Sequence, residues 1–472
     1  MTDFNFAAKT PSRAKTPSRA TAPSRAQVLA RWTRALSLLL FLSGAAAMIV
    51  ELTSQPVLLG RFGDDAELAT MLILALGLGL GCLVGGLLSR PRLSPLPLLV
   101  ALAVLNGASA LAALTIDEST AGSTLAVAPA FVSAMLLGVM TPVALAHLIR
   151  RTGCVGGAFG ECLCVIMLGL AVACLLSAAV VLPLFGEREA RCMAIALDAA
   201  VVVGALAARR CERGLPPLSD APLFQREPIV TSSTSLWLAA GAGALAMSYM
   251  PFFAQAVAYA AAPSDATFSA TLAAFLLGLA AGAHRAGRHC ALFSAEEVMR
   301  RAARSTMAVN LIGLLTLPTL GLFASLDRAV IVVAMLLCFM LARALGALLP
   351  YLAEFAITAD ARARLRSAFL CLAHIAGAGA GAWLTGWVLM DEVGLVALGA
   401  ALVIAGILYT LLLVAVLDLP RWQKVVRGMT AVAIAILALA VLPRWSADVV
   451  ERIAPKAAAG AEPLVGLDRG RS

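Results

Sequence analysis

Charged residues are scarce in this sequence, and their scarcity excludes a water-soluble globule. Asp, Glu, Lys and Arg make up 13% of the 472 residues, whereas hydrophobic residues make up 61%. The mean hydropathy is +0.92. A soluble domain carries about twice this share of charged residues, because its surface faces water. The composition therefore predicts a polytopic membrane protein, whose first partner is the lipid bilayer.

The sequence also lacks the short alternating segments of an outer-membrane barrel. Its apolar runs are instead long, continuous and rich in Leu and Ala. A helix satisfies its own backbone hydrogen bonds within lipid, and roughly 20 helical residues cross a hydrocarbon core of about 30 Å. Twelve such runs begin near residues 35, 68, 95, 123, 157, 190, 236, 266, 305, 329, 366 and 394. A shorter apolar segment, from Thr430 to Leu442, is a thirteenth candidate.

Every second loop between these runs is poor in basic residues. Of the 36 Lys and Arg residues in the chain, these loops hold only Arg61, Arg188, Arg191 and Arg328. The amino-terminal segment and the alternate loops hold most of the others, and such basic loops stay on the cytoplasmic side. We therefore predict an inner (plasma) membrane protein with a cytoplasmic N-terminus. The net charge of +9 is then an orientation signal, and nucleic-acid binding loses its main support.

Two similar stretches indicate an internal duplication. The stretch from Ser43 to Gly86 and the stretch from Ala240 to Gly287 each contain an apolar run, a polar turn and a second apolar run with Gly-x-x-x-Gly. Later landmarks recur at a similar offset, with Asn106 in the first copy and Asn310 in the second. Duplicated multi-helix units are typical of secondary transporters. We therefore predict an all-α membrane protein with two six-helix repeats in a major-facilitator-like arrangement.

These signals divide the chain into five segments. A leader of KTPSRA-like hexapeptides is rich in Pro, Ser and basic residues and has nothing to bury, so we expect it to be disordered. A polar stretch with prolines joins the two repeats on the basic side. The predicted segments are 1–34 (cytoplasmic leader), 35–208 (first repeat), 209–235 (cytoplasmic linker), 236–420 (second repeat) and 421–472 (extra apolar segment and tail).

Neither the glycines nor the cysteines predict a cofactor. The string GLGLGCLVGG at 77–86 lies inside an apolar run, which favours close helix packing over dinucleotide binding. Cys162 and Cys164 lie two residues apart, so on a helix they face different sides and cannot share a metal ion. We therefore predict no cofactor and no metal site.

Polar side chains at membrane depth are few, and each costs several kcal/mol unless it is paired or faces water. They are therefore the candidates for function. The candidates for substrate binding or coupling are Glu51, Tyr249, Arg343 and His374. Helix rise places Arg343 and His374 at similar depths and Glu51 much nearer the other face, so we expect Arg343 to lie near His374 rather than near Glu51.

Each of these residues also has a purely structural interpretation. Glu51 can serve as a buried, protonated hydrogen-bond acceptor, and Arg343 can extend its charge to the membrane interface. Tyr249 can simply pack beside a helix kink at Pro251. Asn106 and Asn310 are predicted to join helices by hydrogen bonds. Asp198 is another polar residue at membrane depth, and the sequence assigns it no role.

Several motifs resemble the membrane part of a fused protein family. They include SGAAAMIVELTSQPVLLGRFG, GVMTPVALAHLIRRTG and GAGAGAWLTGWVLMDEVG. They look like a family that joins a major-facilitator-like helical domain to a spermidine-synthase-like domain. Glu51 occupies a glutamate position typical of that family near the end of the first helix, whereas His374 and Ile375 replace its usual Asn-Thr pair.

The resemblance does not extend to the soluble synthase domain. The tail after Trp445 is too short for a nucleotide-binding α/β domain, so we expect no enzymatic activity. The favoured function is a secondary transporter-like permease for an unidentified small molecule. The alternative is a non-transporting module that anchors a separately encoded spermidine-synthase-like or methyltransferase-like enzyme.

Overall fold

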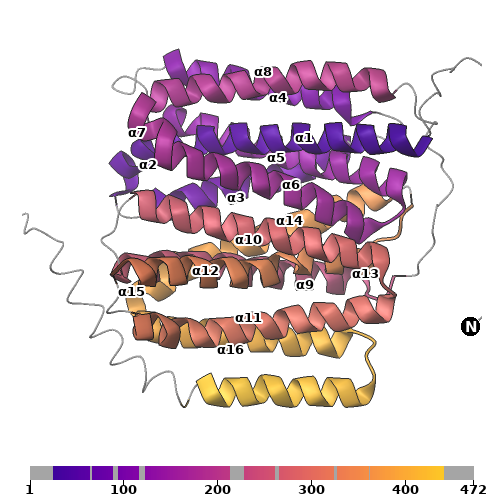
Figure 1. Ribbon diagram of the computed structural model, residues 1–472, viewed down its shortest axis with the longest axis vertical. Coiled ribbons are helices and arrows are strands. Elements are labelled where there is room, and N and C mark those ends of the chain that lie inside the picture. Colours follow the sequence, from indigo (N-terminus) through magenta and orange to yellow (C-terminus); the bar gives the residue numbers. More distant parts are fainter. Residues whose placement is uncertain are drawn as a thin grey trace, which may run out of the picture.

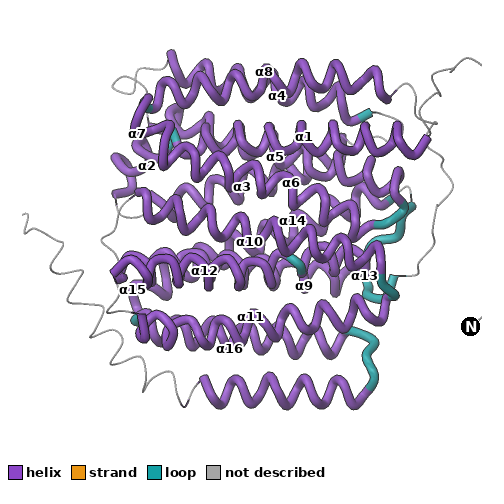
Figure 2. The backbone as a smooth tube through the Cα atoms, viewed as in Figure 1, coloured by secondary structure: helices purple, strands orange, loops and turns teal. Residues whose placement is uncertain are grey.

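The computed structural model describes residues 25–63, 66–88, 94–115, 123–212, 228–260, 265–323, 327–360, 362–438 and 440. All regular elements in these ranges are helical (Figure 2). Twelve helical stretches within them are long and apolar enough to cross a membrane, which confirms the predicted all-helical membrane fold. Most of the predicted leader, the centre of the linker and the tail, at 1–24, 213–227 and 441–472, lie outside the described residues.

The first half of the chain supplies six of these membrane spans. The fifth span combines an α-helix, a π-helical segment and a short α-helix, from Val155 to Phe185. The elements are α1 (Arg25–Leu52), α2 (Gln55–Phe62), α3 (Ala66–Leu88), α4 (Pro95–Thr115), α5 (Ser123–Thr152), α6 (Val155–Leu176), η2 (Ser177–Val181), α7 (Leu182–Phe185) and α8 (Glu187–Glu212).

The second half supplies the other six spans. Its fifth span also contains a π-helical segment, within the stretch Ala363–Leu389. The elements are α9 (Ser232–Ala260), α10 (Asp265–Leu292), α11 (Ala295–Phe323), α12 (Asp327–Gly346), α13 (Leu348–Ala356), α14 (Ala363–Trp383), η3 (Leu384–Leu389), α15 (Met390–Glu392) and α16 (Leu395–Val416).

The membrane helices lie side by side in two rows (Figure 1). One row runs α8, α1, α6, α10, α12 and α11, and the other runs α4, α5, α3, α14, α9 and α16. The two halves therefore meet where α6 packs on α10 and where α3 packs on α14. We call this boundary the seam.

The helix pairs of the two halves correspond. In the first half α1 packs on α6, α3 on α5 and α4 on α8, and in the second half α9 packs on α14, α10 on α12 and α11 on α16. Small residues allow the close approaches. A Cβ atom added to Gly160 of α6 would lie 2.5 Å from the Cα atom of Gly287 in α10, so only glycine fits this part of the seam.

Two helix boundaries differ from the sequence prediction. The first helix begins at Arg25, inside the predicted leader, because Trp32 is fully buried and its ring lies 4.7 Å from that of His147. Another helix covers 421–438, and it begins nine residues before the apolar segment predicted from Thr430 to Leu442. This helix folds back along α16 (Figure 1). Its exposed side chains include Trp422 and Met429.

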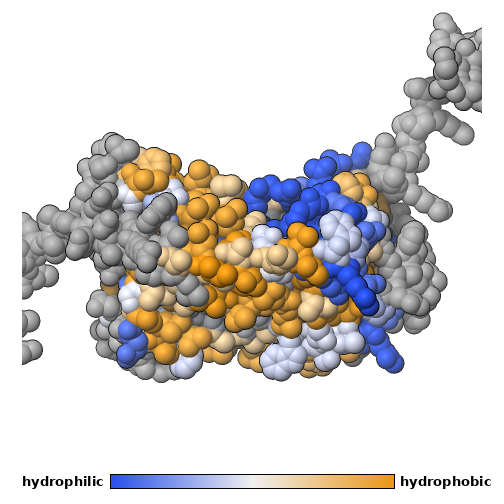
Figure 3. All heavy atoms as spheres, turned by 90° about the horizontal axis from the view of Figure 1, so that it is seen from below, coloured by the Kyte–Doolittle hydropathy of each residue, from blue (hydrophilic) through white to orange (hydrophobic). Residues whose placement is uncertain are grey.

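The surface has the polarity expected of a protein within a bilayer. Seen from the side of the 421–438 helix, apolar side chains cover the middle of the molecule, and hydrophilic side chains gather toward one end (Figure 3). We call this end, at which α8 ends and α9 begins, the linker end. It lies at the right in Figure 1.

Candidate functional site

Three helices next to the seam carry three of the four predicted site residues. They are α1 with Glu51, α9 with Tyr249 and α12 with Arg343, and each packs on a helix that forms the contact between the halves. In this arrangement a side chain on these helices can face either the seam or the interior of its own half.

Glu51 lies one residue before the end of α1, far from the linker end. Its side chain is 3% exposed, and neither carboxylate oxygen has a hydrogen-bond partner. An unpaired carboxylate in a low-dielectric site is costly. Glu51 is therefore a buried acid whose energetic cost a bound proton would remove.

Arg343 and His374 do not make the contact with each other that their depths suggested. The Arg343 guanidinium, near the end of α12, forms no hydrogen bond or ion pair with any described residue. His374 of α14 instead has its Nδ1 atom 3.1 Å from the carbonyl oxygen of Ala239 in α9. Because a carbonyl only accepts, Nδ1 carries the proton and donates it. His374 therefore joins two helices of the second half.

Tyr249 lies in the interior of the second half. Its side chain is fully buried in α9, and its ring packs edge-on against Phe252 with centroids 6.1 Å apart. A Cβ atom on Gly313 of α11 would collide with the Tyr249 hydroxyl, so Tyr249 points at α11. That hydroxyl has no hydrogen-bond partner. This placement favours packing over a direct role at the seam.

A polar contact between the halves lies at the linker end, and the sequence analysis missed it. Glu354 of α13 accepts a hydrogen bond of 2.7 Å from the backbone N–H of Gly156, in the first turn of α6. A helix N-terminus attracts a carboxylate, so the contact is favourable. The signals for it were an acidic residue near the end of the tenth span and a Gly-Gly pair that opens the fifth.

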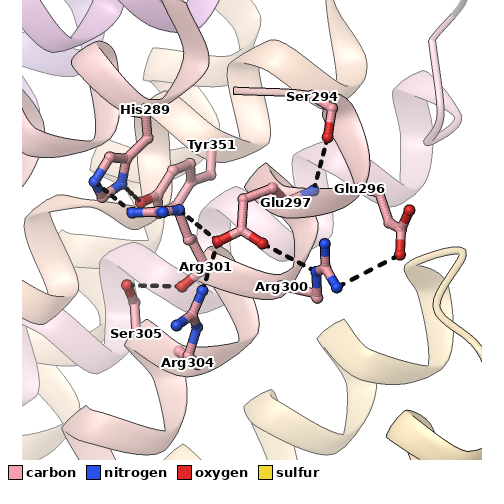
Figure 4. Close-up of polar contacts among 9 residues, drawn as sticks. All are labelled: His289, Ser294, Glu296, Glu297, Arg300, Arg301, Arg304, Ser305 and Tyr351. Atoms are coloured by element: carbon pink, nitrogen blue, oxygen red, sulfur yellow. Dashed lines mark hydrogen bonds and ion pairs between the residues drawn. The ribbon is translucent and has the colours of Figure 1, made fainter. Parts of the chain in front are cut away.

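A charged cluster stiffens the linker end of the second half (Figure 4). Glu297 lies among Arg300, Arg301 and Arg304, with the last two guanidiniums each 2.8 Å from its Oε1 atom. Arg301 also donates to Nε2 of His289, and Nδ1 of His289 lies 2.6 Å from the Tyr351 hydroxyl. Since arginine only donates, Nδ1 of His289 carries the proton and donates to Tyr351. The cluster thus holds α10, α11 and α13 together.

The two asparagines occupy corresponding helix pairs. Asn106 of α4 donates a hydrogen bond of 2.8 Å to Asp198 of α8. Asn310 of α11 donates one of 2.9 Å to Thr410 of α16. Asp198, which the sequence left without a role, is therefore the partner of Asn106.

The part of the chain that the structure describes contains no group of three or more His, Cys, Asp or Glu residues that could hold a metal ion. The nine cysteines whose side chains the structure describes are free thiols, and most of them are buried in the helix bundle. Cys162 is buried, whereas Cys164 is half-buried. Buried thiols of this kind usually act as small apolar side chains.

Comparison with known proteins gives the fold. No protein-family model matches this sequence, and no curated protein is significantly similar to it. Among solved structures, it is similar to the proton:xylose symporter XylE of the major facilitator superfamily, with a TM-score of 0.55 and 12% identity over 90% of this chain and 98% of that one.

Two further solved structures give the same result. A bacterial homologue of the iron transporter ferroportin has a TM-score of 0.54 and 12% identity, over 81% of this chain and 98% of that one. The E. coli fucose:proton symporter FucP has a TM-score of 0.52 and 14% identity, over 84% of this chain and 97% of that one. This chain therefore has the fold of the major facilitator transporters.

Proposed function

We propose that the protein is a secondary transporter-like permease that moves a small molecule across the membrane by alternating access. The observation that carries this proposal is the seam, where two six-helix halves meet chiefly through two helix pairs, α6 with α10 and α3 with α14. Such an architecture lets one half rock against the other around a central site. Structural neighbours named as xylose, fucose and iron transporters support the same activity.

The π-helical segments offer places for the halves to bend. Each lies in the fifth span of its half, η2 at Ser177–Val181 and η3 at Leu384–Leu389. A π-helical turn interrupts the regular α-helical hydrogen bonds and is a frequent site of helix bending. We infer that the ends of α6 and α14 away from the linker end bend at these segments during transport.

Among the candidate residues, Glu51 and Arg343 are the ones to which we assign direct roles. Both carry ionisable groups that have no partner in the described residues, so Glu51 can take up a proton or a ligand and Arg343 can bind an anionic ligand. His374 and Tyr249 are assigned positioning roles, because His374 bonds to α9 and Tyr249 packs on α11. Asn106 and Asn310 contribute hydrogen bonds between helices.

We also propose that the linker end faces the cytoplasm of a cell with this protein in its inner membrane. The basic residues of the alternate loops gather at that end, as expected for cytoplasmic loops. The matching helix pairs of the two halves support an origin by internal duplication. In this orientation the contact between Glu354 and Gly156 closes the cytoplasmic side of the seam.

Transport can be tested even though the substrate is unidentified. Proteoliposomes that contain the purified chain are incubated with a uniformly ¹³C-labelled bacterial metabolite extract, and their contents are identified by mass spectrometry. We expect one or a few metabolites to accumulate above the level in empty liposomes. Glu51→Gln removes the ionisable group from α1, and we expect it to lower accumulation by about tenfold or more, equivalent to about 1.4 kcal/mol of lost coupling or binding.

The matched control is Glu392→Gln, which removes a carboxylate that is exposed in α15. It should transport like the unmodified chain. If no metabolite accumulates with a folded, correctly inserted protein in either direction of an imposed proton or sodium gradient, the proposed transport activity is wrong. If transport occurs and Glu51→Gln does not alter it, the transport proposal stands and the role of Glu51 is wrong.

A second candidate function is the anchoring of a separately made soluble enzyme. The exposed charges at the linker end favour it, because the Arg304 side chain is 62% exposed and the Glu296 side chain 55%. The resemblance to the fused spermidine-synthase-like family would supply the class of partner. Copurification of a spermidine-synthase-like or methyltransferase-like enzyme from native membranes would support this function, and its loss after charge reversal at Arg304 would locate the contact.

A further inference from the structure

A small cavity lies inside the first half, away from the seam. Its volume is about 20 Å³, which is enough for one particle the size of a water molecule. Helices α1, α4, α5 and α8 each supply one polar side chain to its wall, and these are Ser43, Asn106, Ser133 and Asp198. The rest of the wall is apolar and includes leucines of α4 and α5.

The oxygen atoms around this cavity are poorly satisfied by the protein. The amide oxygen of Asn106 and the hydroxyl of Ser133 are both buried, and neither has a hydrogen-bond partner. Asp198 accepts a single side-chain hydrogen bond, from the Asn106 amide. Buried polar atoms in native proteins nearly always have a partner. The cavity therefore has the unmet polar groups that an occupant would satisfy.

Charge specifies the kind of occupant. Asp198 is 3% exposed near the middle of α8, and it forms no ion pair with any described residue. A carboxylate at membrane depth is expensive without a compensating positive charge. A water molecule can complete the hydrogen bonds but brings no charge, and a proton can neutralise Asp198 but leaves the oxygen atoms of Asn106 and Ser133 without a ligand. A small cation meets both needs at once.

The ligand set favours a particular class of cation. One carboxylate, one amide oxygen and hydroxyl oxygens are hard ligands, which suit alkali and alkaline-earth ions rather than transition metals. Calcium sites usually contain several carboxylates, and magnesium keeps several waters. This cavity has one carboxylate and little room. We propose that Asp198, Asn106 and Ser133, with Ser43 beside them, bind a single sodium ion.

This site goes beyond the proposed transport activity, because sodium can bind here whether or not transport is observed. The site lies within one half, so its helices need no contact across the seam. Its occupation would hold α4, α5 and α8 together around one charge. In the second half, Thr410 takes the place of Asp198 beside Asn310, and a neutral hydroxyl gives sodium no countercharge.

Direct binding of ²²Na⁺ to the purified full-length protein in detergent tests the proposal. We expect saturable binding that unlabelled NaCl displaces and that choline chloride at equal ionic strength does not. Asp198→Asn keeps the size of the side chain and removes its charge, and it should lower the affinity by at least about tenfold. Ser133→Ala removes one neutral ligand and should weaken binding by roughly three- to tenfold.

The matched control is Thr410→Ser, which keeps a hydroxyl beside Asn310 in the second half and should bind ²²Na⁺ like the unmodified protein. If Asp198→Asn does not give a monodisperse protein, the ²²Na⁺ affinity of Ser133→Ala tests the proposal instead. Absence of saturable binding by the unmodified protein overturns the proposal. So does unchanged affinity in Asp198→Asn and Ser133→Ala, provided that both elute as folded protein.

Discussion

The two halves place an asparagine at corresponding helix crossings but surround it differently. In the first half Asn106 donates to Asp198 over 2.8 Å. In the second half Asn310 donates a hydrogen bond of 2.9 Å to Thr410. The Thr410 hydroxyl in turn donates a hydrogen bond of 2.8 Å to the carbonyl oxygen of Gly406. The first crossing is next to a cavity, whereas Gly406 brings its helix directly against the Asn310 side chain.

This difference shows how one polar residue can serve two purposes. At Asn310 the neighbouring helix fills the space and supplies a neutral acceptor to the amide N–H, so the residue mainly joins α11 to α16, although its oxygen is unpaired like that of Asn106. At Asn106 the neighbour supplies a carboxylate, and the packing stays incomplete around it. Asp198 and the cavity therefore occur at the same crossing, as expected if the cavity binds a charged ligand. Asn106 and Asn310 therefore occupy corresponding positions without having the same function.

Exchange of the two acceptors should produce the largest effect. Thr410→Asp places a carboxyl group at a crossing that has no space for a cation, and a buried polar group without compensation costs several kcal/mol. We expect a strong loss of folded yield and of resistance to SDS-induced unfolding. The reverse change, Asp198→Thr, keeps an acceptor for Asn106 and should cost only about 1 kcal/mol.

Unfolding of the two variants in mixed detergent and SDS micelles, followed by circular dichroism, measures this asymmetry. Thr410→Ser serves as the control for substitution at the second crossing. Equal destabilisation by Thr410→Asp and Asp198→Thr would show that the two crossings are equivalent. It would contradict the inference that only the first crossing accommodates a charge.

A matched pair of glycine substitutions tests the packing with a smaller effect. A Cβ atom at Gly406 would collide with the amide oxygen of Asn310, whereas one at Gly107 would lie 3.6 Å from the Cβ atom of Asp198, an ordinary contact. Gly406→Ala should therefore destabilise the protein by about 1–3 kcal/mol, as overpacking does. Gly107→Ala should be neutral or stabilising by up to about 1 kcal/mol, because alanine favours the helix.

The same unfolding assay measures both glycine variants. A destabilisation by Gly107→Ala as large as that by Gly406→Ala would mean that the first crossing is packed as tightly as the second. The space assigned to the occupant beside Asp198 would then be absent in solution.

The fold was predictable from the sequence because lipid restricts the choices. Within a bilayer an apolar run of sufficient length has to be a helix, so the twelve spans followed from hydropathy alone. Helix ends were harder to predict where burial continues past the bilayer core. Trp32 lies in the predicted leader, yet it packs on His147 and extends α1. The 421–438 helix contains several basic residues near its start, which hid it in the sequence. Apolar residues nevertheless recur along one of its faces as a continuous stripe.

The site was less predictable, because sequence gives the depth of a residue but not the direction in which it points. Depth suggested that Arg343 and His374 are neighbours, whereas His374 donates to Ala239. Glu51 could be recognised as an acid at membrane depth, but the absence of any partner is visible only in three dimensions. Asp198 gained meaning only when the fold placed it opposite Asn106.

The smallest expected effects concern the π-helical segments, where the two halves are most alike. Ser177 of η2 and Thr385 of η3 are both buried, and neither hydroxyl has a hydrogen-bond partner. Removal of a buried, unpaired hydroxyl costs little, because no hydrogen bond is lost and a desolvated polar group disappears. Ser177→Ala and Thr385→Val should each change the free energy of unfolding by no more than about 0.5 kcal/mol, and by similar amounts. A loss above about 2 kcal/mol in one variant alone would reveal a bonded hydroxyl there, and the two π-helical segments would then differ as the asparagine crossings do.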